Sequence, residues 1–188
     1  MTISLHAQHP DRELRLALTD PRQKERAFRE LVDTYGPRLH AHILRMVHLS
    51  ADADDVLQNT LVKAYRGMEK YRGDSKLYTW LYRIASNESL NWLDKRRRRL
   101  SVTPEQEGNW VDEKLRAEPY FDGDEAQRKL QAAIAGLPDK QRLVFNLRYF
   151  DEMPYQEMSD TLGTSVGGLK ASYHLAAKKI SAQLLQNE

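Results

Sequence analysis

Histidine and aspartate are the side chains of this sequence best suited to chemistry, yet their spacing builds no catalytic or metal site. The six histidines are His6, His9, His40, His42, His48 and His174. His40 and His42 stand two residues apart, so on a helix they point to different faces and do not form a metal pair. Asp52, Asp54 and Asp55 suit the positive end of a helix dipole better than magnesium. The sequence also lacks the common hydrolase, protease and nucleotide-binding motifs, so we predict no catalytic residue, metal ion or cofactor.

Aromatic and cationic side chains alternate between residues 65 and 92. The rings are Tyr65, Tyr71, Tyr78, Trp80, Tyr82 and Trp92, and the cations among them are Arg66, Lys70, Arg72, Lys76 and Arg83. Rings stack on unpaired bases and cations bind phosphates, so this composition suits single-stranded nucleic acid. The alternative is that the rings form core. We expect Trp80 to be partly buried, and Tyr78 and Tyr82 to lie where a ligand could reach them.

The net charge of +2 conceals an uneven distribution. Residues 1–100 hold 19 Lys and Arg against 13 Asp and Glu, residues 101–124 hold 2 against 7, and residues 125–188 hold 8 against 7. A basic front could meet nucleic acid, although a solvated charged surface is an open alternative. Lys95, Arg96, Arg97, Arg98 and Arg99 follow one another. Because they repel each other along a helix, the run favours an anionic ligand.

The stretch Glu157–Ile180 is typical of two short helices joined by a tight turn. Its apolar residues follow helical spacing, Gly163 stands where the first helix must stop, and Ser165 can cap the second. This pattern predicts a helix-turn-helix that binds DNA. A plain helical hairpin is the alternative.

Helical periodicity continues through the rest of the chain. We expect a helix from Asp20-Pro21 that is interrupted at Gly36-Pro37, a helix capped by Ser50 or Asp52, and a long helix over residues 77–98 capped by Asp74 or Ser75. Residues 101–124 show no sustained period and predict an acidic, extended linker.

The sequence therefore predicts an all-α fold of two small helical domains with a flexible acidic linker. The expected parts are a lead-in over residues 1–19, a domain over 20–100, the linker over 101–124, and a helix-turn-helix domain over 125–188. The sequence holds no cysteine, no signal peptide and no apolar run long enough to span a membrane. These features predict a cytoplasmic protein that does not insert into a membrane.

Two segments carry a family resemblance. DADDVLQNTLVKAYRGMEKYRGDSKLYTWLYRIASNESLNWLDKRRRR resembles region 2 of a bacterial sigma factor of the sigma-70 family, extracytoplasmic-function (ECF) group. LPDKQRLVFNLRYFDEMPYQEMSDTLGTSVGGLKASYHLAAKKI resembles region 4 of the same group. The resemblance implies a non-enzymatic subunit that binds core RNA polymerase and promoter DNA. It also implies an anti-sigma factor as a partner.

The resemblance assigns roles to residues of the first domain. Asp52, Asp55 and Gln58 match a helix that docks on the largest polymerase subunit. The residues matching those that read the melted −10 element are Tyr71, Arg72, Gly73, Asp74, Ser75, Lys76, Tyr78, Trp80, Arg83 and Asn87. Lys95, Arg96, Arg97 and Arg98 are similar to a basic helix end that lies along promoter phosphates.

In the second domain, the resemblance implies that the helix after Ser165 enters the major groove of the −35 element. The residues expected at bases or phosphates are Arg142, Ser165, Lys170, Ala171, Ser172, His174 and Lys178. The family often shows a G-T-V-K-S-R run and a later arginine, whereas this chain has Gly167-Gly168-Leu169-Lys170-Ala171-Ser172 and Leu175. Arginine to guanine is the commonest specific contact, so we expect weak affinity for a non-standard −35 sequence.

The sequence thus predicts a sigma factor that recognises −10 and −35 elements and promotes promoter melting. The alternative is a stand-alone helix-turn-helix regulator whose N-terminal half is an effector or dimerisation domain.

Overall fold

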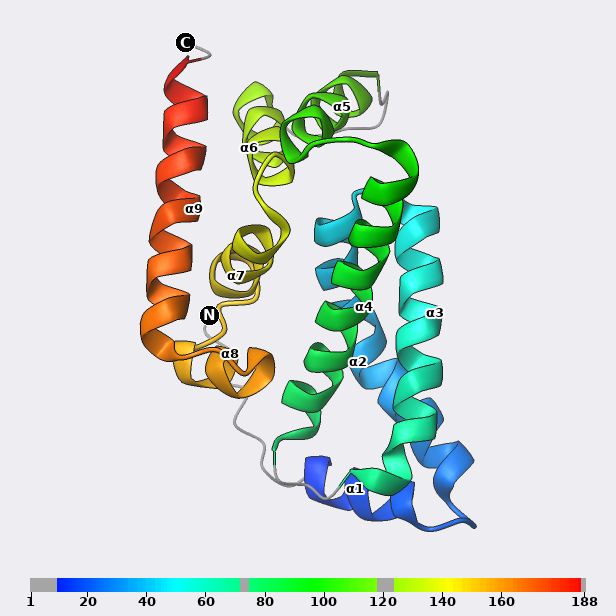
Figure 1. Ribbon diagram of the computed structural model, residues 1–188. Helices are drawn as coiled ribbons and strands as arrows, with labels where there is room; N and C mark the ends of the chain where they lie inside the picture. Colours follow the sequence, from blue (N-terminus) through cyan, green and yellow to red (C-terminus); the bar gives the residue numbers. More distant parts are fainter. Residues whose placement is uncertain (1–9, 72–74, 118–123, 187–188) are drawn as a thin grey trace.

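The computed structural model describes residues 10–71, 75–117 and 124–186, and the regular structure in these ranges is all helical (Figure 1). The helices are α1 (Pro10–Thr19), α2 (Lys24–Val47), α3 (Ser50–Gly67), the short 3₁₀ turn η1 (Met68–Lys70), α4 (Leu77–Leu100), α5 (Pro104–Ala117), α6 (Glu125–Ala135), α7 (Asp139–Tyr149), α8 (Tyr155–Leu162) and α9 (Val166–Gln186). The predicted all-α class is confirmed.

Helices α2, α3 and α4 pack against one another, and α1 crosses one end of this bundle (Figure 1). Leu31 and Ile43 of α2 and Leu81 of α4 have 0% exposure. Burying a side chain of this size contributes roughly 1.5–3 kcal/mol, so these positions fix how the helices pack. The helix expected within the lead-in around Glu13 to Leu18 is present and longer, and α1 buries Leu14 and Leu18 against the bundle.

The predicted interruption at Gly36-Pro37 is wrong, because α2 runs through Pro37 without a break. A proline inside a helix costs about 3 kcal/mol. Leu31 and Leu39, on either side of it, are both completely buried on the core face of α2. Tertiary packing on both sides of Pro37 therefore outweighs the local cost.

Helices α7, α8 and α9 form the helix-turn-helix domain, with α6 packed beside α9. Gly163 ends α8 with a φ of 64°, a left-handed conformation that glycine adopts at little cost. The hydroxyl of Ser165 accepts a hydrogen bond from the backbone N–H of Gly168 at 3.2 Å. Both expectations for this turn are confirmed. The proposed caps of the front helices are wrong, because Leu49 and Lys76 precede α3 and α4 without a side-chain cap.

The linker is helical over most of its described length, which corrects the expectation of an extended segment. Thr103 and Gln106 form a reciprocal cap. The Gln106 side chain accepts from the Thr103 N–H at 2.7 Å, and the Thr103 hydroxyl accepts from the Gln106 N–H at 3.3 Å. Pro104 then occupies the first helical position, where it needs no N–H partner. This start signal was readable in the sequence and was missed.

Helix α5 packs closely on α6, and Gly108 permits the approach. A Cβ at this position would lie 2.8 Å from the carbonyl oxygen of Ala132 and 3.1 Å from the Cα of Gly136. Both neighbours are backbone, so neither can move aside cheaply. The linker helix is therefore held against the second domain.

We expect Gly108→Ala to lower the free energy of unfolding by about 1–3 kcal/mol, because the added methyl group must push α5 from α6. The matched control is Gly167→Ala in α9, where a Cβ meets nothing within 4 Å. There alanine should be neutral or stabilising by up to about 1 kcal/mol. Urea denaturation followed by circular dichroism measures both, and equal effects would contradict the close packing.

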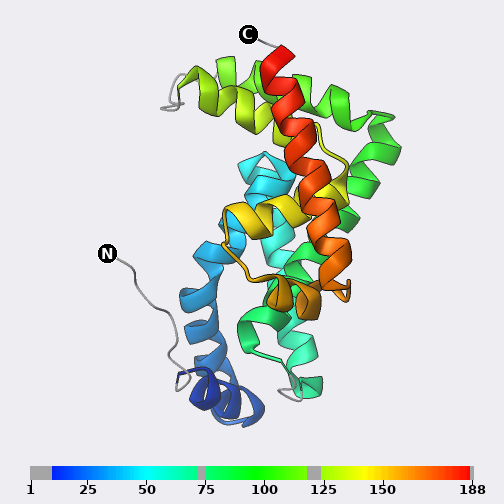
Figure 2. The same ribbon diagram turned by 90° about the vertical axis from the view of Figure 1, so that its left-hand side faces the viewer.

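The two helical domains lie against each other (Figures 1 and 2). Helix α2 contacts α7, and α4 contacts both α7 and α8. Leu143, Leu147 and Met158 of the second domain belong to the same apolar cluster as the core of the first. The faces of the two domains that meet are consequently buried in this arrangement.

Candidate nucleic-acid and polymerase interfaces

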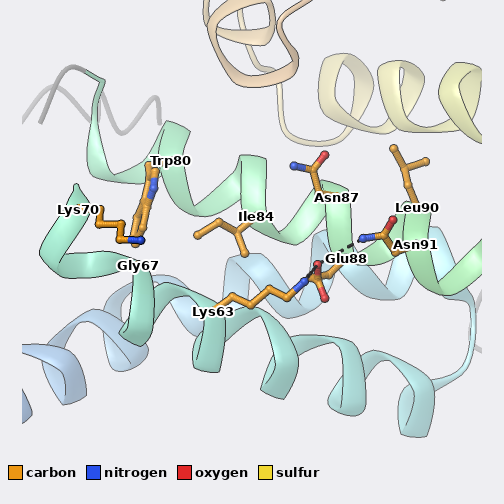
Figure 3. A pocket seen from close by; sticks show the side chains of 9 residues that line it. All are labelled: Lys63, Gly67, Lys70, Trp80, Ile84, Asn87, Glu88, Leu90 and Asn91. Atoms are coloured by element: carbon orange, nitrogen blue, oxygen red, sulfur yellow. Dashed lines mark hydrogen bonds and ion pairs between the residues drawn. The ribbon is translucent and has the colours of Figure 1, made fainter. Parts of the chain in front are cut away.

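A surface groove of about 610 Å³ lies between α3 and α4. Its lining residues are Lys63, Gly67, Lys70, Trp80, Ile84, Asn87, Glu88, Leu90 and Asn91 (Figure 3). Trp80 stands at one end, where Gly67 leaves room for its ring: a Cβ on Gly67 would lie 3.2 Å from Trp80 Cζ2. The Nζ of Lys63 pairs with Glu88 Oε1 at 2.5 Å within the groove. An aromatic ring, amides and lysines in one groove suit an unpaired base and its phosphate.

The structure brings three of the predicted −10 residues to one side of α4. Asn87 and Arg83 are exposed, Trp80 is half-buried, and the three follow helical spacing. Tyr71 lies beside Trp80 with ring centroids 4.9 Å apart. Lys63 and Asn91 join this groove although the sequence reasoning did not select them. Their helical spacing relative to Gly67 and Asn87 was the available signal.

Tyr78 does not join these residues, which corrects the expectation that it and Tyr82 face a ligand. Tyr82 is only 2% exposed, and Tyr78 packs on it with ring centroids 4.3 Å apart. Burial raises the pKa of both phenols. The two tyrosines lie on the opposite side of α4 from Trp80, where Tyr82 is buried and Tyr78 is half-buried.

The loop before α4 is described in part. Arg72, Gly73 and Asp74 lie outside the described residues. The hydroxyl of Tyr71 donates to the carbonyl oxygen of Ser75, which ties the two ends of the loop together.

The basic end of α4 is largely neutralised within the chain. Arg96 pairs with Glu107 of α5 at 2.7 Å, Arg97 pairs with Asp139 of α7 at 2.6 Å, and Arg98 pairs with Asp94 one turn earlier. Lys95 is exposed. Four cations were expected at promoter phosphates. Two of them, Arg96 and Arg97, are therefore paired with carboxylates of the linker and of the second domain.

The predicted polymerase-docking residues lie on the outer side of α3. Asp55 and Gln58 are exposed, and Asp52 in the first turn is half-buried. Val62 is 43% exposed. It lies one turn after Gln58 and two turns after Asp55, on the same side of α3. An exposed branched aliphatic residue beside polar groups suits a docking surface.

Helix α9 presents most of the predicted −35 residues to solvent. Lys170, Ala171, His174 and Lys178 are exposed, whereas Ser172 is half-buried beside the core. Leu169, Ala176 and Ile180 fix the opposite side of α9 against α7 and α8. The exposed positions of α9 carry three lysines, Lys170, Lys178 and Lys179, and one histidine but no arginine.

Arg142 is not available to phosphate in this arrangement, because its side chain is 0% exposed. Its guanidinium donates to the carbonyl oxygens of Met46 at 2.9 Å and of Ala135, and pairs with Glu107 at 3.1 Å. It thus joins the first domain, the linker and the second domain. Sequence position alone could not separate a buried arginine from an exposed one.

His48 lies beside Arg142 at the end of α2, where its backbone has a φ of 67°. Its Nε2 is 3.3 Å from Arg142 Nη1. Burial, followed by the charges of Arg142 and Arg96, lowers the pKa of His48 well below 6.5. The folded protein therefore holds this imidazole neutral.

We expect the free energy of unfolding to fall as the pH drops below 6.5, because the unfolded chain then binds a proton that folded His48 refuses. The contribution is fully present above this pH and is lost towards the lower folded pKa. Urea denaturation at about pH 7.5 and about pH 5.5 measures it. His48→Asn tolerates the left-handed backbone and should flatten the dependence; an unchanged slope would contradict the assignment.

Three further side chains imitate a hydrolase triad. His42 lies 3.2 Å from Ser86 Oγ through Nε2 and 3.2 Å from Asp151 Oδ2 through Nδ1. His42 and Ser86 have 0% exposure, so a substrate cannot reach the hydroxyl without separating the domains. Asp151 also pairs with Arg45. The cluster acts as a contact between the domains.

Comparison with known proteins identifies the family. The model "Sigma-70 region 2" matches residues 31–99, and "Sigma-70, region 4" matches residues 127–180. The RNA polymerase sigma-H factor of Pseudomonas aeruginosa is 34% identical over 171 residues, which cover 87% of this chain and 89% of that protein. The ECF RNA polymerase sigma-E factor of Escherichia coli is 30% identical over 164 residues, covering 83% and 85%. The chain is an ECF sigma factor of the sigma-70 family.

This sigma factor binds core RNA polymerase, recognises −10 and −35 promoter elements and promotes melting for transcription initiation. The stand-alone regulator is not favoured. Its fold is similar to CnrH in complex with the cytosolic domain of CnrY, with a TM-score of 0.68 at 24% identity over 95% of this chain and 99% of that one. It is also similar to the Bartonella quintana sigma factor RpoE in complex with the anti-sigma factor NepR, with a TM-score of 0.64 at 21% identity over 86% and 98%. None of the helices in the described ranges is long and apolar enough to cross a membrane.

Proposed function

We propose that the three surfaces described above divide the work of this sigma factor. Asp52, Asp55 and Gln58, with Val62, form the surface that docks on polymerase. The groove between α3 and α4 holds a base of the melted −10 strand, and the exposed side of α9 enters the major groove at −35. The protein adds binding free energy to the melted strand, carries out no bond chemistry, and acts in the cytoplasm.

The observation that supports the −10 assignment most is that Trp80 and Asn87 of α4 line the groove together with Lys63 and Lys70. A ring beside amide and cationic groups gives a flipped base stacking and hydrogen bonding at once. We expect the exposed side of α9 to bind its promoter element more weakly than the groove binds the −10 strand. Lys170, His174 and Lys178 lack the paired donors with which arginine contacts guanine.

We also propose an anti-sigma factor as a partner. The Bartonella quintana sigma factor of similar fold was solved in complex with one. Pull-down with the purified chain as bait, followed by mass spectrometry, tests this partner.

The experiment that tests the function is transcription in vitro with purified core polymerase. Start sites mapped after overexpression supply the promoter. We expect initiation from this promoter with the sigma factor and none with core alone. Asn87→Ala should lower the yield of transcript, and Asn109→Ala, the same change at an exposed position of α5, should leave it unchanged. Equal loss in both variants would contradict the groove assignment.

A further inference from the structure

Glu88 places a carboxylate inside the groove that we assign to the melted −10 strand. It lies on α4, one turn after Ile84 and two turns after Trp80, and its side chain is 14% exposed. Lys63 Nζ donates to its Oε1 at 2.5 Å, and Asn91 Nδ2 donates to the same oxygen at 3.5 Å. Among the described residues, Oε2 has no hydrogen-bond partner. The carboxylate therefore has one oxygen left with which to accept from a ligand.

The side chains of Glu88, Lys63 and Asn91 form a polar cluster at the opposite end of the groove from Trp80 (Figure 3). Glu88 follows Trp80 by eight positions, which is roughly 12 Å along the helix axis. A hydrogen bond spans only about 3 Å, so a base stacked on Trp80 leaves the polar cluster to another nucleotide. The groove volume of about 610 Å³ is in the range of sites that enclose a whole small-molecule ligand, which gives room for more than one base.

The chemistry of the polar cluster suits the edge of a base and opposes a phosphate. A carboxylate only accepts hydrogen bonds and repels a phosphate, whereas an ammonium only donates. The two groups lie side by side, so together they match a base edge that carries an amino group next to an acceptor nitrogen. Cytosine and adenine have such an edge, and Glu and Asp are the side chains that accept from the cytosine amino group. Thymine and guanine carry a carbonyl oxygen in place of that amino group, which Glu88 would repel.

We propose that Glu88, Lys63 and Asn91 form a second base subsite in the groove, selective for cytosine or adenine in the nucleotide beside the one stacked on Trp80. Oε2 of Glu88 accepts from the amino group, and Lys63 Nζ donates to the ring nitrogen next to it. The amide of Asn91 holds Oε1 in place. The inference rests on the proposed −10 function of the groove, and it adds Glu88 as a residue that determines specificity.

Holoenzyme assembled from core polymerase and this sigma factor tests the selectivity. The probe is a fluorescent single strand of about 12 nucleotides, which carries the −10 sequence of the promoter found by start-site mapping. Each position of the −10 element is changed in turn to each of the four bases, and fluorescence anisotropy gives the affinity. We expect one position at which cytosine and adenine bind about five- to thirtyfold more tightly than thymine and guanine. Absence of any such position would overturn the inference.

Glu88→Gln keeps the shape of the side chain, but its amide can turn to donate to a carbonyl oxygen. We expect the preference at that one position to disappear while preferences at the other positions stay unchanged. Glu113→Gln, the same change at an exposed position of α5, should leave every preference intact. If the preference survived in Glu88→Gln, or if all strands lost affinity equally, Glu88 would only join α3 to α4 and the inference would be overturned.

Asn91→Ala is the second variant, and circular dichroism shows whether each variant is folded. Because Asn91 is exposed and contacts Glu88 at 3.5 Å, its replacement should leave the fold unchanged and weaken the same preference. If Glu88→Gln did not fold, the result for Asn91→Ala would decide, and an unchanged preference would count against the subsite.

Trp80→Leu separates this inference from the proposed function. If Trp80→Leu weakens the binding of every strand and Glu88→Gln alters no preference, the second subsite fails while the groove remains the −10 site. If Trp80→Leu holoenzyme binds all strands as tightly as the unmodified holoenzyme does, the groove assignment fails and the second subsite falls with it.

Discussion

Replacing Arg142 by alanine should lower the free energy of unfolding by about 3–5 kcal/mol, the largest effect on stability that we expect from one residue. The guanidinium is completely buried and satisfies groups in three parts of the chain: the Met46 carbonyl, the Ala135 carbonyl and Glu107. Its loss leaves Glu107, itself only 5% exposed, without one of its two arginine partners. A buried carboxylate that loses a partner costs more than the pair contributed.

Urea denaturation of Arg142→Ala and of the control Lys140→Ala checks this expectation. Lys140 precedes Arg142 by two residues on α7 but is exposed, so its replacement should change stability by less than about 0.5 kcal/mol. Arg142→Met/Glu107→Gln should recover part of the loss, because both charges leave together. If Arg142→Ala were as stable as the unmodified protein, the contacts of Arg142 with the two domains and the linker would not stabilise the fold.

Reversing the charge of Asp55 should raise the dissociation constant for core RNA polymerase by about tenfold or more. Asp55 lies on the exposed side of α3 with Gln58, and Val62 continues this side. An arginine at position 55 would oppose any cation that receives the carboxylate. Since the side chain is exposed, the fold should remain unchanged.

Binding of labelled core polymerase measures the effect of Asp55→Arg, with circular dichroism as a test of folding. Glu113→Arg on α5 carries the same change of charge at another exposed position and is the matched control. Loss of binding in both variants would indicate a general effect of charge. Retention in both would place polymerase docking elsewhere on the molecule.

Local sequence signals were reliable where neighbouring residues decide the structure. Gly163 and Ser165 define the turn of the helix-turn-helix, and the structure shows both in their expected roles. Thr103, Pro104 and Gln106 carried an equally local start signal for α5 that the expectation of an extended linker overlooked. The error at Pro37 is different, since a completely buried residue on each side keeps the helix intact.

The sequence by itself determined the helical class, the two regions and their order, because these depend on periodicity and on motifs of nearby residues. Tertiary structure alone decided which charged groups are free. Arg142 and Arg83 are both arginines within helices, yet one is buried at a junction and the other meets the end of α8. Their partners lie 35 and 96 residues away for Arg142 and 78 for Arg83. Contacts over such separations follow from how the domains pack, which no local pattern specifies.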